Sequence, residues 1–342
     1  MVYKLKPNRV YRSYYGGKRL DALYGHKNPE NSRYPEEWVA STARAFNAGR
    51  EDMVEGYSLC ESGERLIDLI NENPIGMLGT EQVKLHGERT SILVKLLDSA
   101  ERLFIQCHPT IEFAKKNFNS DFGKTECWYI ISAEPDSCVY IGFRKGITKE
   151  KWKRCFISQN VDEMLSLMHR INVKSGDLIF VDGGVPHAIG ANCFLCELQE
   201  PTDLMVIPER TSKSGIMLSD EKMHCGLGFD KMFDCFNYEG YSEKELCNKY
   251  VRRPVVNENS VTPIVNSNLT DKFNMDMVYV KGTVCVEYKD KYAVAIVLEG
   301  ECNLQYGNRV MNLKQGNELF ISASNGVLKF DGSSKIMICS PQ

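Results

Sequence analysis

Four polar residues of metal-ligand type stand in otherwise apolar segments of this chain, and they constrain its fold more than any other feature. Gln106 and His108 lie two apart in an apolar run of strand character, so we expect both to point to one face. Glu126 stands directly before a second strand-like run, and His187 ends a third segment that begins at Gly176. Two imidazoles, a carboxylate and an amide oxygen suit zinc or another borderline divalent ion with open positions for a substrate.

The order and spacing of these residues resemble the metal motifs of cupin barrels. The pattern is Gln-x-His, then Glu, then Gly-x5-Asp-x-Gly-x2-His at residues 176–187. In such barrels a tight glycine turn delivers the last histidine to the barrel mouth. One amide, two imidazoles and one carboxylate leave net positive charge on the metal, which favours Lewis-acid chemistry on sugar or carbonyl oxygens.

The composition is that of an ordinary globular protein. Of 342 residues, 43% are hydrophobic and 25% are charged, and the net charge of −3 provides no basic surface for nucleic acid. Apolar runs are strand-sized and the N-terminus has no apolar signal region, so we expect a cytoplasmic protein without a membrane partner. The 13 scattered cysteines indicate reduced core thiols; Cys193 and Cys196 would face opposite sides of a strand and could not share an ion.

The distribution of predicted elements indicates two β-rich ends joined by a helical piece. We expect a mainly β fold of two cupin barrels (double-stranded β-helix or jelly-roll) with an N-terminal metal-binding domain over 1–218, a helical linker over 219–254 and a C-terminal cupin-like domain over 255–342. Predicted helix caps are Ser62, Thr148, Ser219 and Ser242.

The C-terminal domain repeats the shape of the first without its ligands. Residues 316–327 align with residues 176–187, and Val327 falls where His187 falls. Nothing upstream supplies a second Gln-x-His pair. We therefore expect one metal ion per chain, most simply zinc, in the N-terminal barrel.

From about Tyr14 to Asp203 the chain resembles the zinc-dependent, cupin-type (type I) mannose-6-phosphate isomerases in their short bacterial form. The most specific motifs are Leu-Val-Lys-Leu-Leu-Asp98, Ile-Gln-Cys-His-Pro109, Gly-Lys-Thr-Glu-Cys-Trp-Tyr129 and Gly-Val-Pro-His-Ala188. The resemblance implies that the zinc ligands are Gln106, His108, Glu126 and His187. It also implies that Lys124 lies beside the active site and that Lys95 meets the phosphate end of the substrate, although Lys95 alone would be interpreted as snorkelling at a strand end.

Three departures from the family pattern affect the substrate site. Phe104 stands where the family often has a serine, and Tyr15-Gly-Gly replaces Trp-Gly-Gly. The family's catalytic arginine position holds Ile207, and the next arginine is Arg210. Because Pro208 changes the backbone path, we expect the Arg210 guanidinium to point into the metal cleft instead.

These features predict a metal-dependent aldose–ketose isomerase that interconverts mannose 6-phosphate and fructose 6-phosphate, its partner being this small sugar phosphate. Such a reaction passes through an enediolate, for which zinc, Lys124 and Arg210 would supply positive charge. The base is either Lys124 or Glu197. The alternatives are a related zinc cupin isomerase or epimerase acting on another sugar, and a non-catalytic sugar-binding cupin; the sequence sets no oligomeric state.

Overall fold

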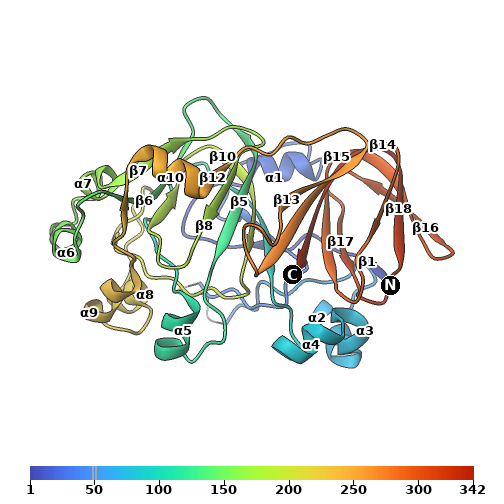
Figure 1. Cartoon of the computed structure of the whole chain (residues 1–342), viewed down its shortest axis with the longest axis horizontal. Coiled ribbons are helices and arrows are strands. Elements are labelled where there is room, and N and C mark those ends of the chain that lie inside the picture. Colours follow the sequence, from blue (N-terminus) through green and yellow to red (C-terminus); the bar gives the residue numbers. More distant parts are fainter. Residues whose placement is uncertain (48–49, 51) are drawn as a thin grey trace.

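The computed structural model of the chain describes residues 1–47, 50 and 52–342. Strands dominate it and form three sheets, as expected for a mainly β protein (Figure 1). The N-terminal sheet has the order β12 (Val251–Arg252), β8 (Leu178–Val181), β5 (Glu126–Ala133), β10 (Cys193–Gln199), β4 (Leu93–Asp98), β3 (Glu36–Val39), β2 (Arg9–Val10). A four-stranded sheet pairs β6 (Cys138–Arg144) with β7 (Met168–Asn172), β9 (His187–Ile189) and β11 (Gly240–Tyr241).

The C-terminal sheet has seven strands, and long antiparallel ribbons make most of it. Its order is β1 (Val2–Lys4), β17 (Glu318–Ile321), β15 (Ala293–Tyr306), β18 (Val327–Pro341), β14 (Phe273–Glu287), β13 (Ser260–Val265), with β16 (Arg309–Lys314) paired to β15. The first strand of the chain therefore completes the sheet built by its last hundred residues.

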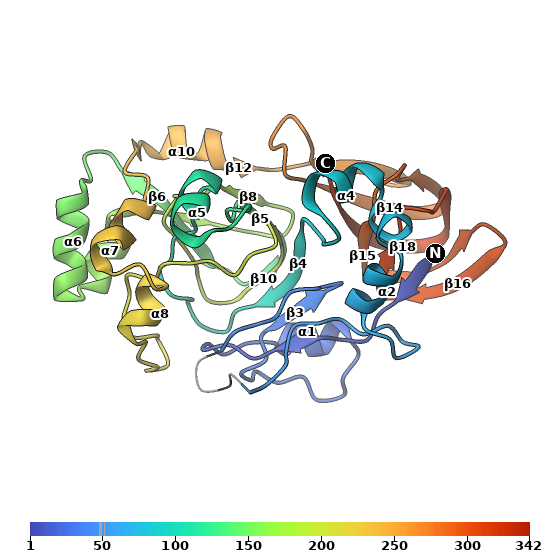
Figure 2. The ribbon, with the colours of Figure 1, turned by 90° about the horizontal axis from the view of Figure 1, so that it is seen from below.

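Helices cover the ends of the sheets. They are α1 (Lys18–Leu23), α2 (Leu66–Glu72), α3 (Pro74–Leu78), α4 (Thr80–His86), α5 (Ile111–Phe118), α6 (Lys149–Ser158), α7 (Val161–Ser166), α8 (Asp220–His224), α9 (Phe229–Met232) and α10 (Glu243–Tyr250). Helices α2–α4 lie beside the C-terminal strands (Figure 2), where Thr80 N donates to Asp290 Oδ1 at 2.9 Å. Across the described residues, no helix is both long and apolar enough to cross a membrane.

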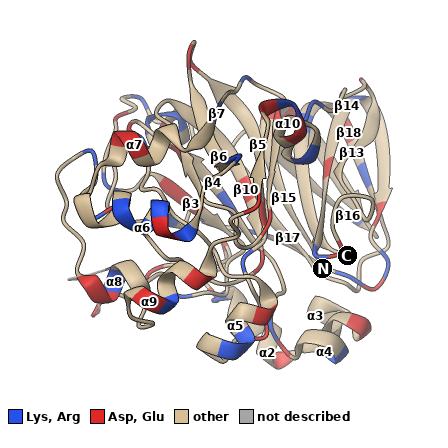
Figure 3. Ribbon diagram, turned by 60° about the vertical axis from the view of Figure 1, so that its left-hand side comes forward, with Lys and Arg blue, Asp and Glu red and all other residues tan. Residues whose placement is uncertain are grey.

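Three of the four predicted helix caps are confirmed, whereas Ser62 is not a cap because α2 begins only at Leu66, with Arg65 at its N-cap position. The side chains of Thr148, Ser219 and Ser242 accept hydrogen bonds from the backbone N–H three residues later, at the starts of α6, α8 and α10. Ser242 and Glu245 complete a reciprocal capping box. Basic and acidic residues both occur on α6, α8 and α9 (Figure 3), and exposed pairs such as Lys149–Asp234 connect these helices to their neighbours.

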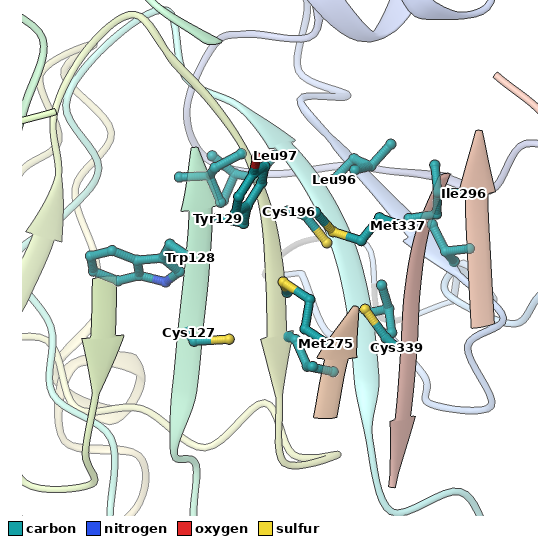
Figure 4. Packing of buried hydrophobic residues seen from close by; sticks show 14 of the residues in the cluster. Leu96, Leu97, Cys127, Trp128, Tyr129, Cys196, Met275, Ile296, Met337 and Cys339 are labelled. Atoms are coloured by element: carbon teal, nitrogen blue, oxygen red, sulfur yellow. The ribbon is translucent and has the colours of Figure 1, made fainter. Parts of the chain in front are cut away.

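Alternation along the N-terminal strands divides their side chains between two environments. Leu96, Cys196 and Tyr129 stand in one cross-strand row and face the C-terminal sheet. There they pack against Met337 and Cys339 in a core that both large sheets share (Figure 4). The opposite face of the same strands is left for a second, more polar interior.

Residues 219–254, predicted to be a linker, pack against the N-terminal sheets. Strand β11 pairs in parallel with β6, and β12 pairs with β8. Leu246 and Tyr250 of α10 lie in the shared core, and Phe233 packs in a second core with Trp152. The three-part division of the chain stays a prediction, but this segment is a packed part of the fold.

Candidate metal centre and cleft

Three fully buried side chains converge on the polar side of the N-terminal sheet. His108, Glu126 and His187 are each 0% exposed, and their candidate donor atoms all lie within 4.8 Å of one another. Glu126 Oε2 is 3.2 Å from His108 Nε2, and Glu126 Oε1 is 3.4 Å from His187 Nε2. In the part of the chain that the structure describes, this is the one group of three or more His, Cys, Asp or Glu side chains that could hold an ion.

Hydrogen bonds to the backbone determine the tautomers of both histidines. His108 Nδ1 lies 2.9 Å from the carbonyl oxygen of Leu204, and His187 Nδ1 lies 2.9 Å from that of Val185. A carbonyl only accepts, so each Nδ1 donates and each Nε2 presents a lone pair to the cluster. Burial lowers the pKa of both imidazoles, that of His108 to about 4, with a further contribution from Lys124.

Glu126 is ionised although it is buried. Burial raises its pKa, but the charge of Lys124 and the interactions with both histidines outweigh this and hold the pKa well below its usual range. Lys124 Nζ lies 2.8 Å from Glu126 Oε2 and 2.7 Å from His108 Nε2, so an ammonium already lies where a cation is attracted. Trp128 Nε1 donates to Glu126 Oε1 at 3.1 Å and orients the carboxylate.

A glycine turn places His187 against Gln106. Gly184 has φ +87° and its N–H donates to the His108 carbonyl at 2.7 Å, while a Cβ on Gly183 would lie 2.8 Å from the Pro109 oxygen. Gln106 and His187 exchange two backbone hydrogen bonds of 2.9 Å. The run 103–109 was expected to be a strand, but it forms only isolated β-bridges. Gln106 pairs with His187 and Cys107 pairs with Val206, so no single neighbouring strand runs along the whole segment.

The cluster fits a divalent metal ion by its own chemistry. His187 Nε2 is a buried nitrogen without a hydrogen-bond partner, although it faces an ionised carboxylate and carries a lone pair. An unpaired buried acceptor of this kind is costly unless something occupies it. Two neutral imidazoles and one carboxylate with further open positions form a donor set that zinc accepts. The Gln106 side chain lines the adjacent cleft, and its role as fourth ligand stays a prediction.

The cleft beside the cluster has a volume of about 340 Å³ and is lined by Gln106 and Lys124 at its metal end. Lys95 and Glu197 line its floor. They are the middle members of one cross-strand row of the N-terminal sheet, in which Trp38, Lys95, Glu197 and Trp128 stand side by side on β3, β4, β10 and β5. Strand alternation gives this row to the cleft and the neighbouring row to the shared core.

Lys95 and Glu197 form a buried pair on this floor. Lys95 Nζ lies 3.0 Å from Glu197 Oε1 and 5.0 Å from the Trp38 ring centroid. Burial lowers the pKa of Lys95, but Glu197 and Glu36 outweigh it and the net pKa is raised. Both residues predicted to act on the substrate therefore line the cleft.

Arg210 lies elsewhere. Its Nη1 donates to Asp220 Oδ1 at 2.6 Å, its backbone is held by Gln159 and Leu218, and it is not among the residues that line the cleft. The expected swing into the cleft is absent because α8 brings a carboxylate to the outer side of this loop. Ile207 does line the cleft, together with Phe104. The catalytic role of Arg210 stays a prediction that this geometry does not support.

The structure also brings three residues to the cleft that the sequence did not indicate as site residues: Arg12, Glu36 and Asp203. Arg12 Nε donates to Glu36 Oε2 at 2.9 Å, and Glu36 also accepts from Tyr14 and Trp38. Burial raises the pKa of Glu36, but Arg12 and Lys95 outweigh it and lower the pKa to about 2. No local motif marks these residues, because Arg12 reaches Glu36 only when β2 pairs with β3, and Asp203 comes from the loop after β10.

Two β-units with a buried His–Glu–His donor set below a polar cleft define a metal-binding cupin protein. A family model for "Phosphomannose isomerase type I, catalytic domain" matches residues 2–129, and one for "Mannose-6-phosphate isomerase, cupin domain" matches residues 266–341. The chain belongs to the type I phosphomannose isomerase family, and the expected cupin fold class is confirmed.

Individual relatives cover nearly the whole chain. It is 25% identical over 330 residues to the mannose-6-phosphate isomerase ManA of Bacillus subtilis (strain 168), covering 95% of this chain and 94% of that protein. The crystal structure of the mannose 6-phosphate isomerase from Bacillus subtilis superimposes with a TM-score of 0.74 at 22% identity, covering 99% of each chain. A zinc-bound mannose 6-phosphate isomerase structure gives a TM-score of 0.75 at 16% identity, covering 100% of this chain and 99% of that one.

Proposed function

We propose that this protein is a metal-dependent aldose–ketose isomerase that interconverts mannose 6-phosphate and fructose 6-phosphate. Family membership supports the reaction, and the observation that carries it is the buried His108–Glu126–His187 cluster at the end of a cleft floored by Lys95 and Glu197. We propose one zinc ion per chain, held by His108, Glu126, His187 and Gln106. When bound, zinc would supply a Lewis acid for the sugar oxygens that develop charge.

The two catalytic candidates in the cleft have different protonation states. Lys124 donates to a carboxylate and to an imidazole lone pair, which assigns it as an ammonium that stabilises negative charge. Glu197 accepts from Lys95 through Oε1 only, so among the described residues Oε2 receives no hydrogen bond. We assign Glu197 as the base that moves a proton between C1 and C2 of the sugar.

Lys95 is our candidate for the phosphate, as the resemblance implied. Its ammonium faces the cleft, and a phosphate dianion can compete with Glu197 for it. The apolar contact between Phe104 and Ile207 in the cleft wall favours one alternative, a related isomerase or epimerase whose sugar differs in the part that meets this wall.

Zinc-loaded protein should be incubated in D₂O with mannose 6-phosphate, fructose 6-phosphate, mannose or another aldose phosphate, and followed by NMR. We expect ketose formation from mannose 6-phosphate with deuterium at the exchanged carbon, and no turnover by His187→Ala. Turnover of another sugar alone would select the alternative. Tight sugar binding without any turnover by metal-replete protein would indicate a non-catalytic sugar-binding cupin.

A further inference from the structure

The basic side chains of the cleft differ in how far they are buried and in whether a carboxylate already binds them. Four basic residues line it: Arg12, Lys95, Lys124 and Lys222. Lys95 and Lys124 are 3% and 2% exposed, and each donates to a buried carboxylate. Arg210 pairs with a carboxylate on another surface, and residue 207 is isoleucine. The other two basic residues of the cleft are Lys222, which is half-buried on α8, and Arg12.

Arg12 is held rigidly with one nitrogen left over. Its guanidinium lies over the Trp38 ring at 4.9 Å, Nε donates to Glu36 at 2.9 Å, and Nη1 is 3.4 Å from Asn47 Oδ1. Nη2 makes no hydrogen bond to any residue that the structure describes, and it lies 4.0 Å from Asp203 Oδ1. This distance is too long for a hydrogen bond.

Asp203 has an acceptor oxygen that lacks a donor, just as Arg12 has a nitrogen that lacks an acceptor. Its Oδ1 is a buried carboxylate oxygen with no hydrogen-bond partner, and it also lines the cleft. A donor nitrogen and an acceptor oxygen thus face each other across 4.0 Å without satisfying each other. A hydroxyl group both accepts and donates, so one hydroxyl oxygen can accept from Arg12 Nη2 and donate to Asp203 Oδ1.

We infer that Arg12 and Asp203 form a clamp for one hydroxyl group of the sugar, and that Arg12 supplies the cleft with the positive charge that Ile207 does not. The inference rests on the proposed isomerase function, because it takes the ligand to be a polyhydroxy phosphate. Arg12 and Asp203 are thereby specificity residues, which recognise a hydroxyl that does not react.

The test combines variants of Arg12 and Asp203 with substrates that lack one hydroxyl group, so that the side chain and the hydroxyl are removed separately and together. Kinetics of the zinc-loaded parent, Arg12→Lys and Asp203→Asn should be measured with mannose 6-phosphate and with its 3-deoxy and 4-deoxy analogues. We expect the parent to lose kcat/KM about 10- to 100-fold on one deoxy substrate, as for a hydrogen bond to a charged group. Both variants should lose that discrimination, with most of the change in KM. Asp203→Asn keeps the side-chain shape, and Arg12→Lys keeps a charge beside Glu36.

Arg19→Met is the matched control. Arg19 is likewise an arginine held by ion pairs, in its case with Asp98 and Glu134, but it does not line the cleft. It should keep the discrimination of the parent. If the Arg12 and Asp203 variants lose kcat/KM equally on all three substrates, the pair has a structural role. If their kinetics equal those of the parent, only water bridges Arg12 and Asp203. Either result overturns the clamp. An inactive parent would instead contradict the isomerase function, and calorimetry with mannitol phosphate would then test the clamp by binding alone.

Discussion

Replacement of Glu318 should remove a specific pH dependence of stability. Glu318 on β17 is 2% exposed, accepts a hydrogen bond from Tyr24, and lies close enough to the fully buried Glu37 of β3 to raise the pKa of that carboxyl as well. Burial raises the pKa of Glu318 to about 8, from an ordinary value of 4.5. Two carboxyl groups thus share a dry position between the N-terminal and C-terminal sheets.

The sign follows from proton binding. Between pH 4.5 and about 8 the folded chain holds a proton on Glu318 that the unfolded chain has released. This stabilisation is fully present below the unfolded pKa and is lost as the pH rises through the folded pKa. The free energy of unfolding falls by about 1.4 kcal/mol per pH unit where the folded chain holds this proton and the unfolded chain does not, and it levels off above the folded pKa. Going from about pH 6 to about pH 9 should therefore lower the free energy of unfolding by roughly 2 to 3 kcal/mol.

The assay is urea unfolding of the parent and Glu318→Gln across that pH range. Glutamine keeps the shape and does not titrate, so the difference in unfolding free energy between the two proteins should change by roughly 2 to 3 kcal/mol from about pH 6 to about pH 9. Glu299→Gln is the control, since Glu299 pairs with Lys335 on the exposed face of the same sheet. A difference between parent and Glu318→Gln that does not vary with pH would refute the reasoning.

Three further substitutions test the site. His187→Ala should abolish zinc retention by elemental analysis, whereas His169→Ala, which removes a buried histidine bound to a backbone carbonyl away from the cluster, should keep it; full occupancy in His187→Ala would remove this residue from the ligand set. Lys95→Met should raise KM for mannose 6-phosphate by about 10-fold or more but affect mannose much less; equal weakening of both would make Lys95 structural. Arg210→Ala should leave kcat within about twofold, as for loss of an exposed ion pair; a loss near 100-fold would restore the catalytic role predicted from the sequence.

The metal cluster could be predicted because its residues contrast with their surroundings. His108, Glu126 and His187 stand beside apolar strand residues, and their combination with Gln106 in the order and spacing of a cupin metal motif indicates a metal site where each residue alone would not. The helix caps at Thr148 and Ser242 were predictable for a similar reason, since each acts on backbone only three residues away. In both cases the chemistry is local or is marked by an unusual residue type.

The rest of the cleft depends on contacts between distant segments. Arg12 comes within 4.0 Å of Asp203 only after β2 pairs with β3 and the loop after β10 folds over the sheet. The direction of Arg210 depends on Asp220, ten residues later, and the preceding Pro208 does not distinguish that partner from the cleft. Likewise, β1 is a strand of ordinary sequence, and its position beside β17 is decided by which sheet has an open edge.

Phe104 and Ile207, the two departures from the family pattern in the cleft wall, lie in the same cluster of packed side chains. Phe104 and Ile207 are about a hundred positions apart, yet they pack in one small cluster with Leu218 and Met223 of the α8 region. A serine at 104 beside an isoleucine at 207 would leave a hydroxyl against an apolar wall, and an arginine at 207 would bury charge against Phe104. Four basic and three acidic residues line the cleft, and the carboxylate paired with Lys124 is that of Glu126 in the metal cluster. In the clamp inferred above, the positive charge that this wall does not supply comes from Arg12, which is supported by Trp38 and Glu36.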